Sequence, residues 1–141
     1  MSKETSKLDV ILFVDDEKIC HTFTRLSILD ATEYKVVSAY DGQHAIAMAE
    51  EYSSNLCLIL SDMVLPDMNG YNIYQILKND VRFCDIPFLF QSGLEFREME
   101  LIRYSTDKNI PSDINSIRKP YSKSQLVQAI HDTMAQLKET C

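Results

Sequence analysis

Five side chains in this sequence could together bind a cation and a phosphoryl group. They are three carboxylates, one hydroxyl and one amine: Asp15, Asp16, Asp62, Ser92 and Lys119. Three carboxylates that lie close together repel one another at pH 7, and a single lysine cannot neutralise them. Such a cluster is expected to bind a divalent cation or to take up a proton. Mg²⁺ suits it, because proteins hold this hard ion with a few carboxylates, several waters and substrate phosphate.

These residues lie far apart along the chain, so only the fold could bring them together. Each follows a short run of strand length: Val10–Val14, residues 56–60, residues 87–90 and residues 114–117, the last with apolar residues only at its two ends. A further β-branched run covers Lys35–Ala39. Runs that are apolar throughout are typical of strands buried on both faces, as in parallel sheets.

Helical periodicity fills the segments between these runs. The apolar stripes of the expected helices are Ile19, Phe23, Leu26 and Leu29; Ala45, Met48 and Ala49; Ile73, Ile76 and Leu77; and Leu126, Ile130, Met134 and Leu137. Ser122 and Gln125 form a capping box that marks the start of the last helix. A thinner stripe predicts one more helix over residues 95–104.

Strands and helices therefore alternate, which predicts an α/β fold with right-handed crossovers and a parallel sheet covered on both faces. We expect residues 1–7 to form a flexible tail and residues 8–141 to form one domain. Sheets of this kind bind ligands at the carboxyl ends of their strands. The five side chains fall there: Asp15 and Asp16 after the first strand, Asp62 after the third, Ser92 after the fourth and Lys119 after the fifth.

Composition excludes several other functions. The chain has 141 residues and a net charge of −7, which argues against a nucleic-acid-binding surface because such surfaces need clustered basic residues. Its apolar runs are far shorter than the roughly 20 residues that a membrane span needs. The polar N-terminus lacks the apolar region of a signal peptide. We therefore expect a cytoplasmic protein without nucleic-acid or membrane partners.

The residues at the strand ends stand in stretches that resemble the receiver domain of two-component response regulators. The matching residues are Asp15, Asp16 and Glu17; Asp62, Pro66 and Gly70; Ser92 and Gly93; and Lys119 and Pro120. The combination is specific, although any one piece alone would be weak. The resemblance implies a doubly wound, flavodoxin-like (β/α)5 fold with strand order 2-1-3-4-5. It also implies a cis peptide bond before Pro120.

The resemblance implies a role for each residue. Asp62 would be the phospho-acceptor, a carboxylate nucleophile that takes a phosphoryl group from a histidine kinase or a histidine phosphotransfer protein. The implied protein ligands of Mg²⁺, for which Mn²⁺ could substitute, are Asp15, Asp16, Asp62 and the backbone carbonyl of Val64. Asp16 would bind the ion directly and Asp15 largely through water. Lys119 would pair with a phosphoryl oxygen, and Ser92 would be the switch hydroxyl that turns toward the phosphoryl group.

Three features depart from the family pattern. Ser116 stands where the family usually has Tyr or Phe, so the inward swing of an aromatic ring cannot occur there. Residues 106–113 lengthen the loop after the fourth helix, either through drift or as a partner-specific surface. Val64 and Leu94 are apolar and cannot orient a water for attack on an acyl phosphate. We therefore expect slow self-dephosphorylation, which a half-life of seconds with Mg²⁺ would contradict.

Other residues of reactive type are expected to have structural roles. His21, His44 and His131 fall on expected helices, and none resembles a phosphotransfer histidine, so we expect them at solvated positions. Gly70 is expected to supply a turn or helix-start geometry that other residues dislike.

The expected function is that of a stand-alone receiver, which accepts a phosphoryl group on itself and signals to a downstream protein by altered contacts. It would not be a turnover enzyme. Two alternatives remain: a receiver-like binding module that works without phosphorylation, and a receiver segment of a larger regulator or hybrid kinase. An aspartyl-phosphate phosphatase fits poorly, because those enzymes use a D-x-D motif and Asp15 and Asp16 are adjacent.

Overall fold

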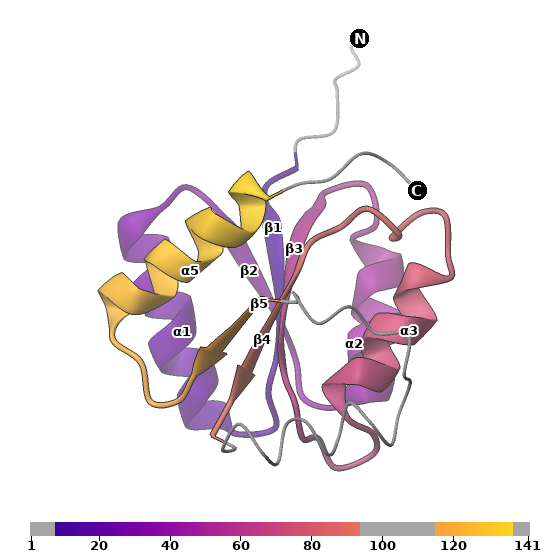
Figure 1. Cartoon of the computed structure of the whole chain (residues 1–141), viewed down its shortest axis with the longest axis horizontal. Coiled ribbons are helices and arrows are strands. Elements are labelled where there is room, and N and C mark those ends of the chain that lie inside the picture. The colour runs from indigo at the N-terminus through magenta and orange to yellow at the C-terminus, as the bar shows by residue number, and fades with distance from the viewer. Residues whose placement is uncertain (1–7, 94–114, 137–141) are drawn as a thin grey trace, which may run out of the picture.

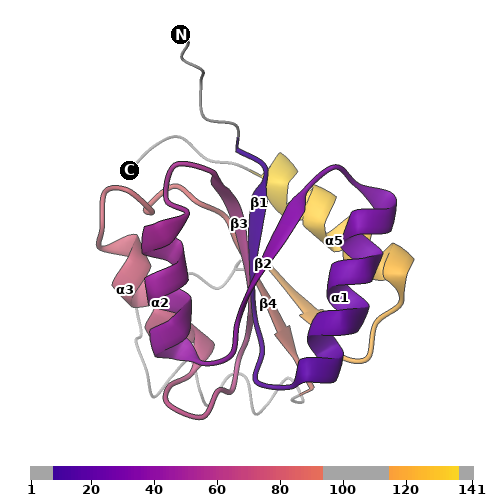
Figure 2. The same cartoon turned by 180° about the vertical axis from the view of Figure 1, so that it is seen from behind.

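Five parallel strands and the helices that connect them make up the described part of the protein. The computed structural model describes residues 8–93 and 115–136. The elements are β1 (Val10–Val14), α1 (Lys18–Ala31), β2 (Lys35–Ala39), α2 (Gly42–Glu51), β3 (Leu56–Asp62), α3 (Gly70–Lys78), β4 (Phe88–Ser92), β5 (Asn115–Arg118) and α5 (Lys123–Ala135). The strand order is 2-1-3-4-5, which confirms the predicted fold. Helices α1 and α5 cover one face of the sheet, and α2 and α3 cover the other (Figures 1 and 2).

The continuous apolar strands are explained by the two cores that the sheet separates. All five residues of β1 are buried. Val10, Leu12 and Val14 pack into the core shared with α2 and α3. Ile11 and Phe13 point the other way, into the core shared with α1 and α5. Successive side chains of a strand point to opposite faces, so a strand between two layers of helices needs apolar residues at every position.

The strands extend further toward their carboxyl ends than the apolar runs predict. β3 includes Ser61 and Asp62, and β4 includes Gln91 and Ser92. Backbone hydrogen bonding continues where the side chains become polar, because Asp62 pairs with Gln91 in the parallel ladder. The predicted helix over residues 95–104 and the loop over residues 106–113 lie outside the described residues.

Helix α1 lies on the sheet with a different face from the one its apolar stripe predicts. The predicted stripe is exposed: Ile19 by 79%, Phe23 by 44%, Leu26 by 60% and Leu29 by 48%. The buried residues of α1 are His21, Thr24, Ser27 and Ile28. Polar side chains can be buried at low cost when they find hydrogen-bond partners. His21 and Thr24 both do so, in contacts with residues of other elements.

The solvated position expected for His21 is therefore wrong. Its imidazole is 4% exposed. One ring nitrogen lies 2.7 Å from the backbone oxygen of Asp15, and the other lies 2.9 Å from the hydroxyl of Ser38. The side chain thus ties α1 to the end of β1 and to β2. His131 is exposed on α5, as expected.

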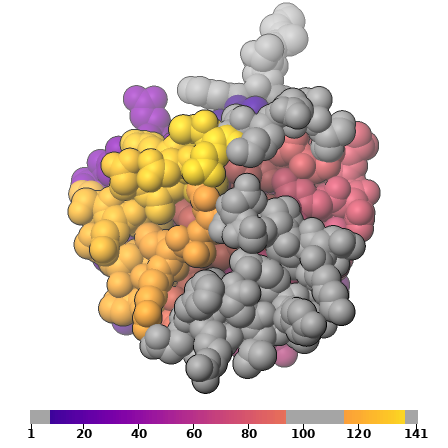
Figure 3. Space-filling model, in the orientation of Figure 1, coloured from indigo at the N-terminus to yellow at the C-terminus, as the bar shows by residue number. Residues whose placement is uncertain are grey.

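Helix α5 begins where the sequence predicts. Ser122 is its N-cap and accepts a hydrogen bond from the backbone of Gln125, while the Gln125 side chain accepts one from the backbone of Ser122. Leu126 and Ile130 are fully buried against the sheet. In the space-filling view, α5 forms one side of the front face of the molecule (Figure 3). No helix in residues 8–93 and 115–136 is long and apolar enough to cross a bilayer.

Candidate functional site

The predicted carboxylates meet at the carboxyl ends of the strands because of the sheet register. Val14 of β1 pairs with Ser61 of β3, so the residues that follow them, Asp15 and Asp62, come side by side. Ligand oxygens of Asp15, Asp16 and Asp62 all lie within 4.8 Å of one another. Asp15 is fully buried, Asp62 is 8% exposed and Asp16 is open to solvent. The fold therefore gathers three acids that are 47 residues apart at most (62 − 15 = 47).

Lys119 provides the positive charge at this cluster. It follows directly after β5, and its Nζ lies 3.0 Å from Oδ2 of Asp15 and 3.3 Å from Oδ2 of Asp62. Burial alone would lower the pKa of Lys119, but the Asp62 and Asp15 carboxylates outweigh it and raise the pKa above its ordinary value. The lysine is therefore charged at pH 7, and three acids and one ammonium leave an excess of negative charge.

The pKa of Asp62 is raised mainly by the burial of its carboxyl group. Burial raises the pKa of Asp62 to about 6; the Lys119 ammonium opposes this rise and the Asp15 carboxylate adds to it. Its Oδ1 accepts a hydrogen bond from the backbone N–H of Met63 at 3.1 Å. A second cation next to this carboxylate would lower its pKa and favour the ionised form.

The donor set fits a hard divalent cation. Three carboxylates contribute only oxygen ligands, the kind that Mg²⁺ prefers. Cys20 lies near Asp15 and Glu17, close enough to share an ion with them. Burial and the nearby Asp15 raise the pKa of the Cys20 thiol to about 12, so the thiol is protonated at pH 7 in the metal-free protein.

The loop after Asp62 folds back on itself, so that Gly70 packs against the end of β3. The backbone N–H of Gly70 donates to the carbonyl of Met63 at 2.8 Å, and Val64 and Asn69 form an isolated bridge. A Cβ atom on Gly70 would lie 2.6 Å from the backbone oxygen of Asp62. Gly70 does not have a positive φ angle, so the expected reason for this glycine is wrong: close packing requires it, not an unusual backbone conformation. Val64 itself stands in the loop with its side chain half exposed.

Ser92 and Lys119 are joined through the backbone. Ser92 ends β4 and is 2% exposed, and its carbonyl accepts a hydrogen bond of 2.8 Å from the backbone N–H of Lys119. The peptide bond between Lys119 and Pro120 is cis, as the resemblance implies. Ser116 is exposed on β5.

Two polar residues next to the acids had no predicted role. The side-chain amide of Gln91 is fully buried and donates to Oδ2 of Asp15 at 2.7 Å. Its carbonyl oxygen accepts a hydrogen bond of 2.5 Å from the hydroxyl of Tyr121. The only signal in the sequence is that Gln91 follows an apolar strand directly; nothing in the spacing joins it to Tyr121.

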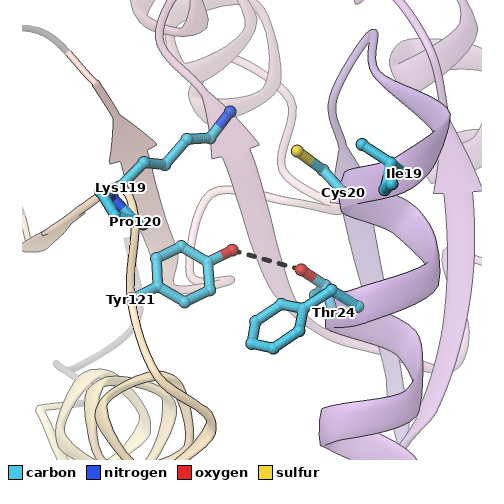
Figure 4. A pocket seen from close by; sticks show the side chains of 7 residues that line it. Ile19, Cys20, Thr24, Lys119, Pro120 and Tyr121 are labelled. Carbon is cyan, nitrogen blue, oxygen red and sulfur yellow. Dashed lines mark hydrogen bonds between the residues drawn. The ribbon is translucent and has the colours of Figure 1, made fainter.

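A groove opens beside the acidic cluster, between α1 and the segment after β5. It encloses about 360 Å³ and is mostly apolar, and its lining residues are Ile19, Cys20, Phe23, Thr24, Lys119, Pro120 and Tyr121. Figure 4 shows Lys119 and Tyr121 facing Cys20 and Thr24 across it. Part of the exposed stripe of α1 therefore forms one wall of a groove whose far end reaches the site.

Comparison with known proteins agrees with this arrangement. Residues 11–131 match the model of the response regulator receiver domain. The response regulator SaeR of Staphylococcus aureus (strain USA300) is 28% identical over 133 residues, which cover 92% of this chain and 52% of SaeR. The chain therefore spans about half the length of the curated relatives it matches.

Solved structures share the fold. The chemotaxis response regulator CheY4 of Vibrio cholerae superposes with a TM-score of 0.75 at 20% identity, over 90% of this chain and 99% of CheY4. A sensor protein from Polaromonas sp. JS666 superposes with a TM-score of 0.76 at 19% identity, over 92% of this chain and 98% of that one. From the family match over most of its length, the chain belongs to the response regulator receiver domains of two-component systems.

Proposed function

We propose that the protein accepts a phosphoryl group on Asp62 from the phosphohistidine of a histidine kinase or a histidine phosphotransfer protein. The observation that carries this proposal is the position of Asp62, a nearly buried carboxylate that lies between Lys119 and two further acids. A carboxylate oxygen attacks the phosphorus, and a P–O bond forms while the P–N bond breaks. The donor's imidazole keeps the electron pair of the broken bond.

The residues around Asp62 neutralise and orient the incoming group. Phosphoryl transfer depends on in-line positioning and charge stabilisation more than on covalent help. Asp16 and Asp15, with Asp62 and the Val64 carbonyl, would hold Mg²⁺, and Mn²⁺ could replace it. The bound ion supplies positive charge beside the phosphoryl oxygens. Lys119, already in contact with Asp62, would neutralise the remaining charge.

The signal is a local change that alters contacts with another protein. A phosphoryl group on Asp62 draws the Lys119 ammonium and the Ser92 hydroxyl toward it. Both residues lie at strand ends joined by the backbone hydrogen bond between them, so a movement of one affects the other. We propose that residues 8–141 form a single receiver domain that signals in this way and does not turn over a separate substrate.

The groove beside α1 is the proposed docking site of the phosphodonor. Ile19 and Phe23 expose apolar surface that faces Pro120 and Tyr121, and such surface favours a partner with an apolar helix face. Lys119 lines both the groove and the acidic site. A donor helix in the groove would therefore present its phosphohistidine near Asp62.

The test is phosphorylation of the purified chain with Mg²⁺ and a small phosphodonor, followed by intact mass. We expect one phosphate adduct on the wild type and none on Asp62→Asn. Asp85→Asn is the matched control, because Asp85 is an exposed aspartate in the loop before β4 and should leave the adduct unchanged. An Asp62→Asn variant that still forms the adduct would refute the assignment. A wild type that no donor phosphorylates would favour a binding module that works without phosphorylation.

A further inference from the structure

A chain of hydrogen bonds runs from the acidic site to the groove through residues to which the phosphoryl-transfer scheme gives no role. The Gln91 amide donates to Oδ2 of Asp15 at 2.7 Å, the Tyr121 hydroxyl donates to Oε1 of Gln91 at 2.5 Å, and Thr24 lies 3.2 Å from the Tyr121 oxygen. The four residues come from the loop after β1, from α1, from β4 and from the segment after β5. Figure 4 shows the outer link, between Tyr121 and Thr24.

The charge of Asp15 fixes the direction of every bond in this chain. A carboxylate only accepts, so Gln91 must turn its N–H₂ toward Asp15 and its carbonyl oxygen toward Tyr121. Burial raises the pKa of Tyr121 to about 12, so the phenol keeps its proton. Its O–H therefore donates a hydrogen bond to the Gln91 carbonyl oxygen. The Tyr121 oxygen is then left to accept from the hydroxyl of Thr24.

Packing alone does not account for Gln91. Its side chain is completely buried in β4, where an aliphatic residue could fill the same volume without polar groups to satisfy. Both ends of its amide are instead used, one on Asp15 and one on Tyr121. Buried polar networks that are fully satisfied hold their members in one arrangement.

This chain of hydrogen bonds, called the relay below, adds Gln91 to the donors that hold the Asp15 carboxylate. Oδ1 accepts from the backbone N–H of Glu17 at 2.9 Å, and Oδ2 accepts from both Gln91 and Lys119. If the Lys119 ammonium moves from Asp15 to a phosphoryl group, the hydrogen bond from Gln91 to Oδ2 of Asp15 can remain. Groups that orient a metal ligand in this way commonly decide how well the ligand binds the metal.

We propose that Gln91 and Tyr121 are positioning residues for the metal site, and that they couple this site to the groove between α1 and the segment after β5. The inference deepens the proposed function and rests on the metal site assigned there. Tyr121 belongs to both places, because its ring lines the groove while its hydroxyl orients Gln91. A partner that displaces the Tyr121 ring would therefore alter the hydrogen bond from Gln91 to Asp15.

The first test measures Mg²⁺ affinity by titration calorimetry for the wild type, Tyr121→Phe, Gln91→Leu and the double variant. We expect Gln91→Leu to weaken binding by about tenfold or more, the usual effect of losing such a partner. Tyr121→Phe, which keeps the ring, should weaken it less. The two effects should not add, because both variants break one chain. Tyr34→Phe is the matched control, since its hydroxyl contacts Met134 at the other end of the strands.

The second test needs no metal and detects the relay directly. With ¹³C at the ring carbon that bears the hydroxyl, the Tyr121 signal is assigned from Tyr121→Phe among the seven tyrosines. Asp15→Asn should shift this signal, whereas Asp16→Asn, the same change at an exposed neighbour outside the relay, should not. Equal signals in both variants, or unchanged Mg²⁺ affinity in Tyr121→Phe and Gln91→Leu, would overturn the relay alone. A wild type that binds no Mg²⁺ would overturn the proposed metal site with it.

Discussion

The ammonium of Lys119 lies 3.3 Å from the carboxylate of Asp62, which joins the end of β5 to the end of β3 across the intervening strand β4. This ion pair is shared with Asp15, at 3.0 Å, so the lysine balances two buried acids at once. A single cation placed in this way is suited to move between carboxylates and a phosphoryl group.

Replacing Lys119 with Met should slow phosphorylation of Asp62 strongly. The variant keeps the aliphatic chain but loses the charge that stabilises the transferring group, and loss of one such group commonly costs about 10²-fold in rate. The measurement is the rate of adduct formation with a small phosphodonor and Mg²⁺. Lys123→Met is the control, because Lys123 is exposed on α5 and pairs with Asp30. Equal rates for both variants would contradict the role of Lys119.

In the metal-free protein, the stabilising contribution of Asp62 should be lost as the pH rises from about 4 to above 6. Asp62 has a pKa of about 6 in the folded protein, above its ordinary value of 3.8, so the folded state holds the proton more tightly than the unfolded state does. The contribution is present below pH 4 and is lost through pH 6. Because Asp62 keeps some contact with solvent, we expect a loss of only about 1–2 kcal/mol.

Urea denaturation in EDTA at several pH values measures this effect. Asp62→Asn cannot ionise, so its free energy of unfolding should increase relative to that of the wild type as the pH rises through 6, and should exceed it at pH 7.5. The prediction fails if the two proteins show the same pH dependence between pH 4 and 7.

Mg²⁺ should stabilise the wild type at pH 7.5 and should stabilise Asp16→Asn much less. A ligand that binds only the folded state raises the free energy of unfolding by about 2.7 kcal/mol at 100 times its dissociation constant. Asp16 is the exposed member of the carboxylate cluster, so the variant removes a proposed ligand without opening the core. Thermal unfolding with Mg²⁺ or with EDTA measures the difference, and an equal gain for both proteins would exclude Asp16 as a ligand.

Gly70→Ala should destabilise the protein and displace Asp62. The added methyl group would meet the Asp62 carbonyl at 2.6 Å and the Phe90 ring at 3.0 Å, and neither can move without a shift of the strands. Such overpacking typically costs about 1–3 kcal/mol. Gly42→Ala is an informative comparison, because there the three atoms nearest to the methyl group all belong to the flexible side chain of Met68. Urea denaturation should show a larger loss for Gly70→Ala, and a larger loss for Gly42→Ala would contradict the packing argument.

Phe23→Glu should impair phosphorylation by a phosphohistidine protein while sparing phosphorylation by a small phosphodonor. Phe23 lines the proposed docking groove and is 44% exposed on α1. Val81→Glu provides the control, because Val81 is 83% exposed in the loop before β4, at the opposite end of the strands. The two donors are compared by adduct formation over time. If Phe23→Glu slows both donors equally, the groove is not a docking site.

The sequence determined the fold class and the place of the acids. Strands that are apolar at every position must be buried on both faces, and parallel strands bring their carboxyl ends to one edge. Asp15 and Asp62 stand at the ends of two such strands, and Lys119 follows the weaker run over residues 114–117, so the sequence alone predicts that they meet. The capping box of Ser122 and Gln125 is equally local, and it forms as predicted.

Which face of α1 is buried, and which groups hydrogen-bond to Asp15, depends on contacts between elements that are distant in the sequence. Periodicity ranks faces by apolar character, and it favoured Ile19 and Phe23, which are exposed. His21 is buried instead because Asp15 and Ser38 satisfy its ring nitrogens, and those partners come from other elements. Hydrogen bonds between distant residues leave no periodic trace in a sequence. The same is true of the link between Gln91 and Tyr121, which exists only once the strands are in register.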